Sequence, residues 1–184
     1  MTAHTPPTGS TDGTGLGTRA DGVGQAAPDG YSTVTPWVIS SDTARLIDFV
    51  QAAFGAHELA RVPGPDGRIG HAEVRIGDSV VMMFDRAAGW PETPGFLRLY
   101  VEDADLVYER ALAAGATSVT PVTSLFFGDR VGRVRDPLGN IWWIQAHETD
   151  VDPAELARRP PDPAAMAALR RVEMSLDAAM RQPD

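Results

Sequence analysis

The sequence predicts an α+β fold in which two βαβββ modules form a curved mixed sheet around a cleft, with an added C-terminal helix. Two observations carry this prediction. A capped amphipathic helix occurs twice, at 42–56 and 103–116, and each copy follows one β-type run and precedes several more. The repeat period of about 60 residues is too long for a solenoid unit. Two small α+β units that pack together would enclose a cleft.

The first module spans residues 31–86. Residues 32–40 read as a strand, and Pro36 indicates an edge or a bend. Asp42 is the expected N-cap of a helix that Gly55 ends. The remaining strands are predicted on either side of two turns, Gly-Pro-Asp-Gly and Gly-Asp, at residues 57–62, 69–76 and 79–84.

The second module spans residues 95–147 and repeats this order. A strand and a helix come first, then a strand, an apolar loop and two strands around the turn Asp-Pro-Leu-Gly-Asn. Their expected ranges are 96–101, 105–114, 117–122, 124–128, 129–135 and 141–146.

Two segments flank the predicted domain of residues 31–147. Residues 1–30 are rich in Gly, Thr, Pro and Asp, and this composition predicts a disordered tail because it buries too little apolar surface. Residues 148–184 are predicted to be a helical extension, with a helix over 164–181. Its apolar stripe must cover this domain or a second subunit. The stripe consists of Met166, Leu169, Val172, Leu176 and Met180.

Composition narrows the function classes. The net charge of -9 argues against nucleic acid or an anionic membrane as the main partner. The absence of Cys excludes disulfides and thiolate metal sites. No apolar run approaches the roughly 20 residues of a membrane span, and the start of the chain lacks a secretory pattern. We therefore expect a cytoplasmic protein.

Several motifs resemble one known family. The helix ends FGA and AGA, the run GHAEVRIGDSVVMM and above all GDRVGRVRDPLGNIWWI are similar to the glyoxalase/bleomycin-resistance/dioxygenase family, the vicinal oxygen chelate superfamily. The resemblance covers about residues 31–147. It implies paired βαβββ modules around a cleft, and a homodimer.

Metal enzymes of that family hold a divalent ion with His, Glu or Gln side chains on strands. The resemblance places these positions at Thr35, Met82, Phe96 and Trp143. None of these side chains binds a hard or borderline divalent ion in the usual way. We therefore expect no metal and no cofactor.

The cleft of this fold is expected to hold a small molecule. Strand alternation places His71 and Glu73 on the face away from the core, where they can act as an acid/base pair or form a structural hydrogen bond. Aromatic walls with a few polar anchors are typical of small-molecule sites. The predicted ligand-binding residues are Thr35, Trp37, Phe96, Arg98, Tyr100, Phe127, Arg130, Trp143 and Gln145.

Three functions follow as hypotheses. The first is a metal-free protein that binds an aromatic or cationic small molecule, as bleomycin-sequestering members of the family do. The second is a superfamily enzyme of the lyase, isomerase or dioxygenase type, which uses His71 and Glu73 or a non-standard metal site assembled across a dimer. Convergence of any two of His71, Glu73, Gln145 and His147 within metal-bond distance would favour it. The third is an interaction protein that docks through its C-terminal helix.

Overall fold

The computed structural model describes residues 27–28, 30–158 and 162–181. The predicted disordered tail, residues 1–30, lies outside the described part of the chain except for residues 27, 28 and 30. No helix in the described ranges is both long and apolar enough to cross a membrane.

The first module forms a four-stranded sheet, which we call sheet A, in the order β1-β4-β3-β2. Strand β1 runs parallel to β4, and the other neighbours are antiparallel. As predicted, the Asp42 carboxylate caps helix α1 by accepting a hydrogen bond from the backbone nitrogen of Arg45, and Gly55 ends the helix with a φ of 67°. The elements are β1 (Trp37–Ser40), α1 (Thr43–Phe54), β2 (His57–Pro63), β3 (Ile69–Ile76) and β4 (Ser79–Asp85).

The first predicted strand is shorter than expected. Residues 32–36 lie outside β1, which begins at Trp37, so the prediction of one strand over 32–40 was wrong in its first half. Pro36 stands immediately before the strand, where its missing N–H removes no ladder bond. Its carbonyl still accepts a hydrogen bond from Met82, at the start of the β1–β4 pairing.

The second module repeats the topology as sheet B, in the order β5-β8-β7-β6. Again the first strand of the module pairs in parallel with the last. The prediction of an α+β fold with paired βαβββ modules is therefore confirmed, with the eight strands divided between two sheets. The elements are β5 (Phe96–Tyr100), α2 (Ala104–Ala113), β6 (Thr117–Ser124), β7 (Asp129–Arg135) and β8 (Ile141–His147).

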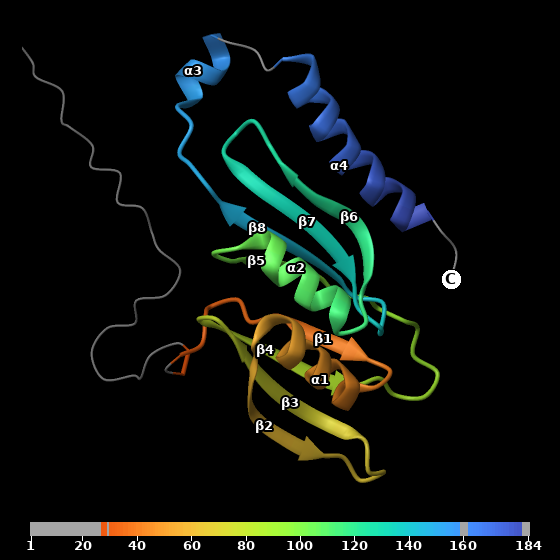
Figure 1. The fold of residues 1–184 in the computed structure, drawn as a ribbon. Coiled ribbons are helices and arrows are strands. Elements are labelled where there is room, and N and C mark those ends of the chain that lie inside the picture. Colours follow the sequence, from red (N-terminus) through yellow and green to blue (C-terminus); the bar gives the residue numbers. More distant parts are fainter. Residues whose placement is uncertain (1–26, 29, 159–161, 182–184) are drawn as a thin grey trace, which may run out of the picture.

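One hydrophobic core runs through both modules. Helices α1 and α2 lie side by side and cover their own sheets (Figure 1). At this contact the ring of Phe54 lies 4.9 Å from the ring of Trp142, which is completely buried. The guanidinium of Arg110 also donates to the carbonyl of Ala52, from α2 to α1. The two sheets are thus held at a defined relative position by their helices.

The turn between β7 and β8 is built around the buried carboxylate of Asp136. It accepts hydrogen bonds from the backbone nitrogens of Leu138 and Asn140 at 2.8 and 3.0 Å. It also accepts from the Asn140 amide at 2.8 Å and from the Trp142 indole at 2.9 Å. Asn140 in turn accepts a bond from the nitrogen of Gly95 at 2.8 Å. This network joins the turn, the core and the start of β5.

The C-terminal extension contains α3 (Pro153–Arg158) and α4 (Pro163–Arg181). Helix α4 packs on sheet B, where Val172 is 3% exposed and Ser175 hydrogen-bonds to Thr120 at 2.7 Å. Leu169 packs beside Val172, whereas Met180 is 63% exposed. The middle of the predicted stripe therefore covers this domain, and docking through it would require α4 to leave the sheet.

We predict that Asp136→Asn lowers the free energy of unfolding by roughly 2–3 kcal/mol, because the amide nitrogen faces buried donors that lose their acceptor. Chemical denaturation measures the change. The matched control is Asp78→Asn, since Asp78 is exposed and should stay within about 0.5 kcal/mol of the wild type. Equal effects of the two substitutions would contradict the role of the network.

Candidate functional site

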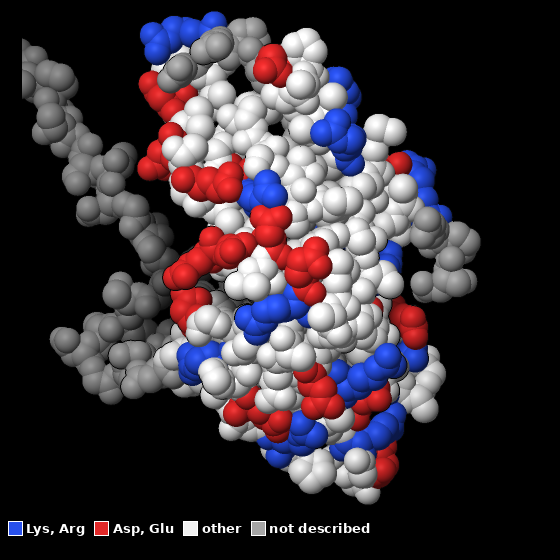
Figure 2. Space-filling view, in the orientation of Figure 1, with Lys and Arg blue, Asp and Glu red and all other residues white. Residues whose placement is uncertain are grey.

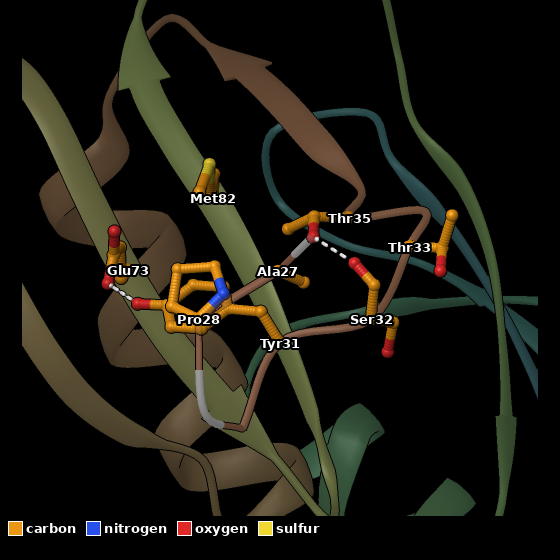
Figure 3. A pocket seen from close by; sticks show the side chains of 8 residues that line it. All are labelled: Ala27, Pro28, Tyr31, Ser32, Thr33, Thr35, Glu73 and Met82. Carbon is orange, nitrogen blue, oxygen red and sulfur yellow. Dashed lines mark hydrogen bonds between the residues drawn. The ribbon is translucent and has the colours of Figure 1, made fainter. Parts of the chain in front are cut away.

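A cavity of about 410 Å³ lies against the face of sheet A that points away from α1. Figure 3 shows its two sides: Glu73 and Met82 project from β3 and β4, and the segment before β1 forms the opposite wall. The bond from the Tyr31 backbone nitrogen to the carbonyl of Pro28 shapes that wall. The lining residues are Ala27, Pro28, Tyr31, Ser32, Thr33, Thr35, Glu73 and Met82.

Among the described residues that line the cavity, Glu73 supplies the one carboxylate, and it has two hydrogen-bond partners. The hydroxyl of Tyr31 donates to one oxygen, and the Nε2 atom of His71 lies 2.9 Å from the other. The bond from Tyr31, followed by the one to His71, holds the pKa of Glu73 below its usual range. The same Glu73 contact raises the pKa of Tyr31. The arrangement therefore favours an ionised carboxylate at the cavity wall.

Aromatic rings extend this site along β1 and β4. The ring of Trp37 is 57% exposed and lies 6.1 Å from the ring of His71 and 5.3 Å from that of Phe84. The Trp37–Phe84 pair has an edge-to-face geometry, which is a favourable arrangement for aromatic rings. An exposed indole thus lies beside the Glu73–His71 pair and offers a flat stacking surface.

The four positions that the family resemblance assigns to metal ligands come from both modules. Thr35 and Met82 line the cavity, whereas Phe96 and Trp143 lie on sheet B. A hydroxyl, a thioether and two rings do not fit a divalent ion, which prefers carboxylate, imidazole or thiolate donors. Within the described ranges, no group of three or more His, Asp or Glu side chains is placed to hold a metal.

Four of the predicted ligand-binding residues lie on sheet B. Phe96 and Tyr100 are 50% and 67% exposed, and the guanidinium carbon of Arg98 lies 4.2 Å from the centre of the Trp143 ring. Described ring contacts do not join Trp37 to Phe96 or Trp143. The residues that the sequence assigns to one aromatic cleft come from both modules, Thr35 and Trp37 from the first and the others from the second.

Three further candidates, two on sheet B and Phe127 in the loop between β6 and β7, are held by local contacts. Arg130 pairs with Asp105 of α2, and Phe127 packs in a small apolar cluster below α4. The buried Gln145 donates to Asp129 at 2.6 Å, and the same carboxylate contacts His147. None of these side chains lines the cavity on sheet A.

The residues considered for a non-standard metal site are also divided between the two sheets. They are His71, Glu73, Gln145 and His147. His71 and Glu73 lie on β3 of sheet A, and the other two lie on β8 of sheet B. Residues from opposite modules would have to meet to form the non-standard metal site. The described structure gives each pair its own hydrogen-bond partners instead.

Sequence reasoning missed Tyr31 and the wall segment that contains it. Tyr31 directly follows the polar residues 1–30, in which large apolar side chains are nearly absent. An isolated aromatic residue at such a boundary is a usable signal, because it must find a surface to cover. Arg133 was also missed as a site residue: it reads as one of three solvated arginines on a strand, but it is 3% exposed.

Comparison of the sequence with known proteins identifies its family. A sequence model of the Glyoxalase/Bleomycin resistance protein/Dioxygenase superfamily matches residues 31–144. The chain belongs to this superfamily. The uncharacterized protein Rv0887c of Mycobacterium tuberculosis is 39% identical over 134 residues, which cover 67% of this chain and 79% of that protein. The uncharacterized protein Mb0911c of Mycobacterium bovis is also 39% identical over 134 residues, 88% of its length.

Solved structures agree with the superfamily fold. The crystal structure of TioX from Micromonospora sp. ML1 matches with a TM-score of 0.55 and 29% identity, and the match covers 63% of this chain and 98% of TioX. Protein PA1353 from Pseudomonas aeruginosa matches with a TM-score of 0.54 and 19% identity over 63% of this chain and 98% of its own. The second likeness, at this identity, concerns the fold alone.

We predict that Tyr31→Phe raises the pKa of Glu73 toward its usual value, because the substitution removes the largest cause of its depression. Carbon-13 NMR titration of the side-chain carboxyl measures the change. Tyr100→Phe is the matched control, since Tyr100 lies on the other sheet. An unchanged titration of Glu73 in Tyr31→Phe would contradict this interpretation.

The same variant should alter the dependence of stability on pH. A carboxyl group with a depressed pKa in the folded state stabilises the fold above its unfolded-state pKa, and this contribution is lost as pH falls through the folded-state pKa. The wild type should therefore be more stable than Tyr31→Phe at neutral pH, and the difference should vanish in acid below both pKa values. Denaturation curves from pH 7 to strongly acidic conditions measure this.

Proposed function

We propose that the chain is a small-molecule-binding protein that holds a flat organic cation in the cavity on sheet A. The observation that carries this proposal is the charge of the cavity: among the described residues that line it, Glu73 is the one Asp, Glu, Lys or Arg side chain. Its hydrogen bonds favour the ionised form. An ionised carboxylate in a partly enclosed site attracts a cation more strongly than an exposed one does.

The surrounding side chains suit the flat part of such a ligand. Tyr31 and Trp37 offer aromatic surface, Met82 offers an adaptable apolar contact, and the hydroxyl of Thr35 is a polar anchor at the wall. Aromatic pairs contribute roughly 0.5–1.5 kcal/mol beyond the burial of area. Two such contacts with one ion pair support binding without catalysis.

The charge of the whole molecule acts in the same direction. Figure 2 shows acidic side chains gathered across the middle of the face on which α1 and α2 lie, opposite to the cavity on sheet A, and mixed charges on the lower module. The net charge is -9. A negative potential raises the local concentration and the association rate of cations, and this effect decreases with salt.

We predict that benzamidine, a flat aromatic cation, binds in a saturable 1:1 manner and that its neutral isostere benzamide binds at least tenfold more weakly. Isothermal titration calorimetry at low salt measures both. Glu73→Gln should reduce benzamidine affinity at least tenfold, about 1.4 kcal/mol, because it removes the charge but keeps the shape.

The matched control for this experiment is Glu58→Gln. Glu58 is also a strand carboxylate, but it pairs with Arg61 on β2 and does not line the cavity. The control should bind benzamidine like the wild type. Equal affinity of Glu73→Gln and the wild type, or no preference for benzamidine over benzamide, would rule out a cation site at Glu73.

A second candidate function is acid–base catalysis by a superfamily enzyme at the same place. It is favoured by the 2.9 Å contact between His71 and Glu73, because a carboxylate that orients an imidazole is a common general-base arrangement. Incubation with a small-molecule extract, followed by mass spectrometry, tests it. A mass change that the wild type produces and His71→Gln does not would support catalysis, and an extract left unchanged by the wild type would contradict it.

A further inference from the structure

A row of three side chains crosses sheet B on the face opposite α2. Arg98 of β5, Trp143 of β8 and Arg133 of β7 are direct neighbours in the strand register. The guanidinium carbons of Arg98 and Arg133 lie 4.2 and 3.9 Å from the centre of the Trp143 ring. Two cations thus share one indole, and the geometry of each contact is that of a cation–π interaction.

Arg133 is the unusual member of this row. It is 3% exposed, and its Nη1 atom donates to the hydroxyl of Thr120 at 3.0 Å and to the carbonyl of Val172 at 2.8 Å. Its Nε atom is buried without a partner. The ion pairs of the described residues include neither Arg133 nor Arg98. Burial, followed by the nearby charge of Arg98, lowers the pKa of Arg133.

Other buried polar atoms beside this row also have no partner. The donor among them is the indole nitrogen of Trp143; the side-chain oxygen of Gln145, two residues further along β8, is an acceptor and does not favour an anion. A buried cation without a counter-ion is costly for folding. Native proteins rarely retain such atoms together, and where they do, a bound ion or ligand is an ordinary explanation.

We propose that the row of Arg98, Trp143 and Arg133 is a binding site for a small oxyanion, either a carboxylate or a phosphoryl group. In the described structure the Nε–Nη2 edge of Arg133 makes no hydrogen bond, and this edge of a guanidinium binds two oxygens side by side. Arg98 is exposed at the edge strand and supplies the entrance and a second positive charge. The Trp143 indole supplies a further donor.

Helix α4 is the wall of this site. Its Val172 carbonyl accepts from the Nη1 atom of Arg133, so the guanidinium is oriented with its other edge free. Leu169 and Val172 exclude water from one side of Trp143. The proposal does not depend on the cation site, because that cavity lies on sheet A and shares no lining residue with this row.

The test uses full-length protein and two probes, benzoate for carboxylates and inorganic phosphate for phosphoryl groups, at constant ionic strength. At least one probe should raise the Tm in a saturable manner, because binding to the folded state alone stabilises it. The affinity for this probe should fall at least tenfold in Arg98→Gln, a substitution at an exposed position. It should fall as much in Arg133→Lys, because lysine keeps the charge but lacks the Nε–Nη2 edge.

The matched control is Arg135→Gln. Arg135 also donates to α4, through the carbonyl of Ala179 at 2.9 Å, but it does not contact Trp143. It should lose at most twofold in probe affinity. The proposal would be overturned if the Tm of the wild type showed no saturable response to either probe. It would also be overturned if Arg98→Gln and Arg133→Lys both bound the probe as the wild type does. Arg133 would then be an anchor for α4, a role that lysine could share.

Discussion

The buried carboxylate of Asp136 is the interaction on which the arrangement of sheet B depends. Its oxygen atoms accept the hydrogen bonds that fix the turn before β8. The bond from the Trp142 indole also fixes which face of β8 enters the core. A strand that slips by one residue exchanges its two faces. With Trp142 held inward against Phe54, Trp143 must point to the opposite face, between the two arginines.

The same alternation explains why much of the fold follows from sequence. Caps, turns and faces are local properties, so Asp42, Gly55 and the inward positions of β3 could be read directly from the chain. The position of His71 and Glu73 on one face, and their contact, follow from their spacing of two residues. Local rules were sufficient wherever the partner of a residue lies on the same or the adjacent strand.

The rest depends on contacts between segments that are far apart in the chain. Tyr31 meets Glu73 because the segment before β1 folds back over sheet A; an isolated aromatic residue indicates that some surface is covered but not which one. The sequence assigns Arg133 to a solvated face because charged and apolar residues are interspersed in Asp-Arg-Val-Gly-Arg-Val-Arg. It is buried because α4, some 40 residues later, covers it. Likewise, side-chain direction on a strand does not define how two sheets are placed, so the sequence does not show how the candidates of the two modules lie relative to one another.

The wall of the cavity on sheet A is made by chain that lies outside the βαβββ elements. Residues 27–35 precede β1, and they supply six of the lining residues, whereas the sheet supplies two. Elements of a scaffold are constrained by the core, but connecting segments at the surface tolerate substitution and insertion. Substitutions in this short segment are therefore less constrained by the hydrophobic core than substitutions in the strands, so the shape of the cavity can change among related proteins while the two sheets stay the same.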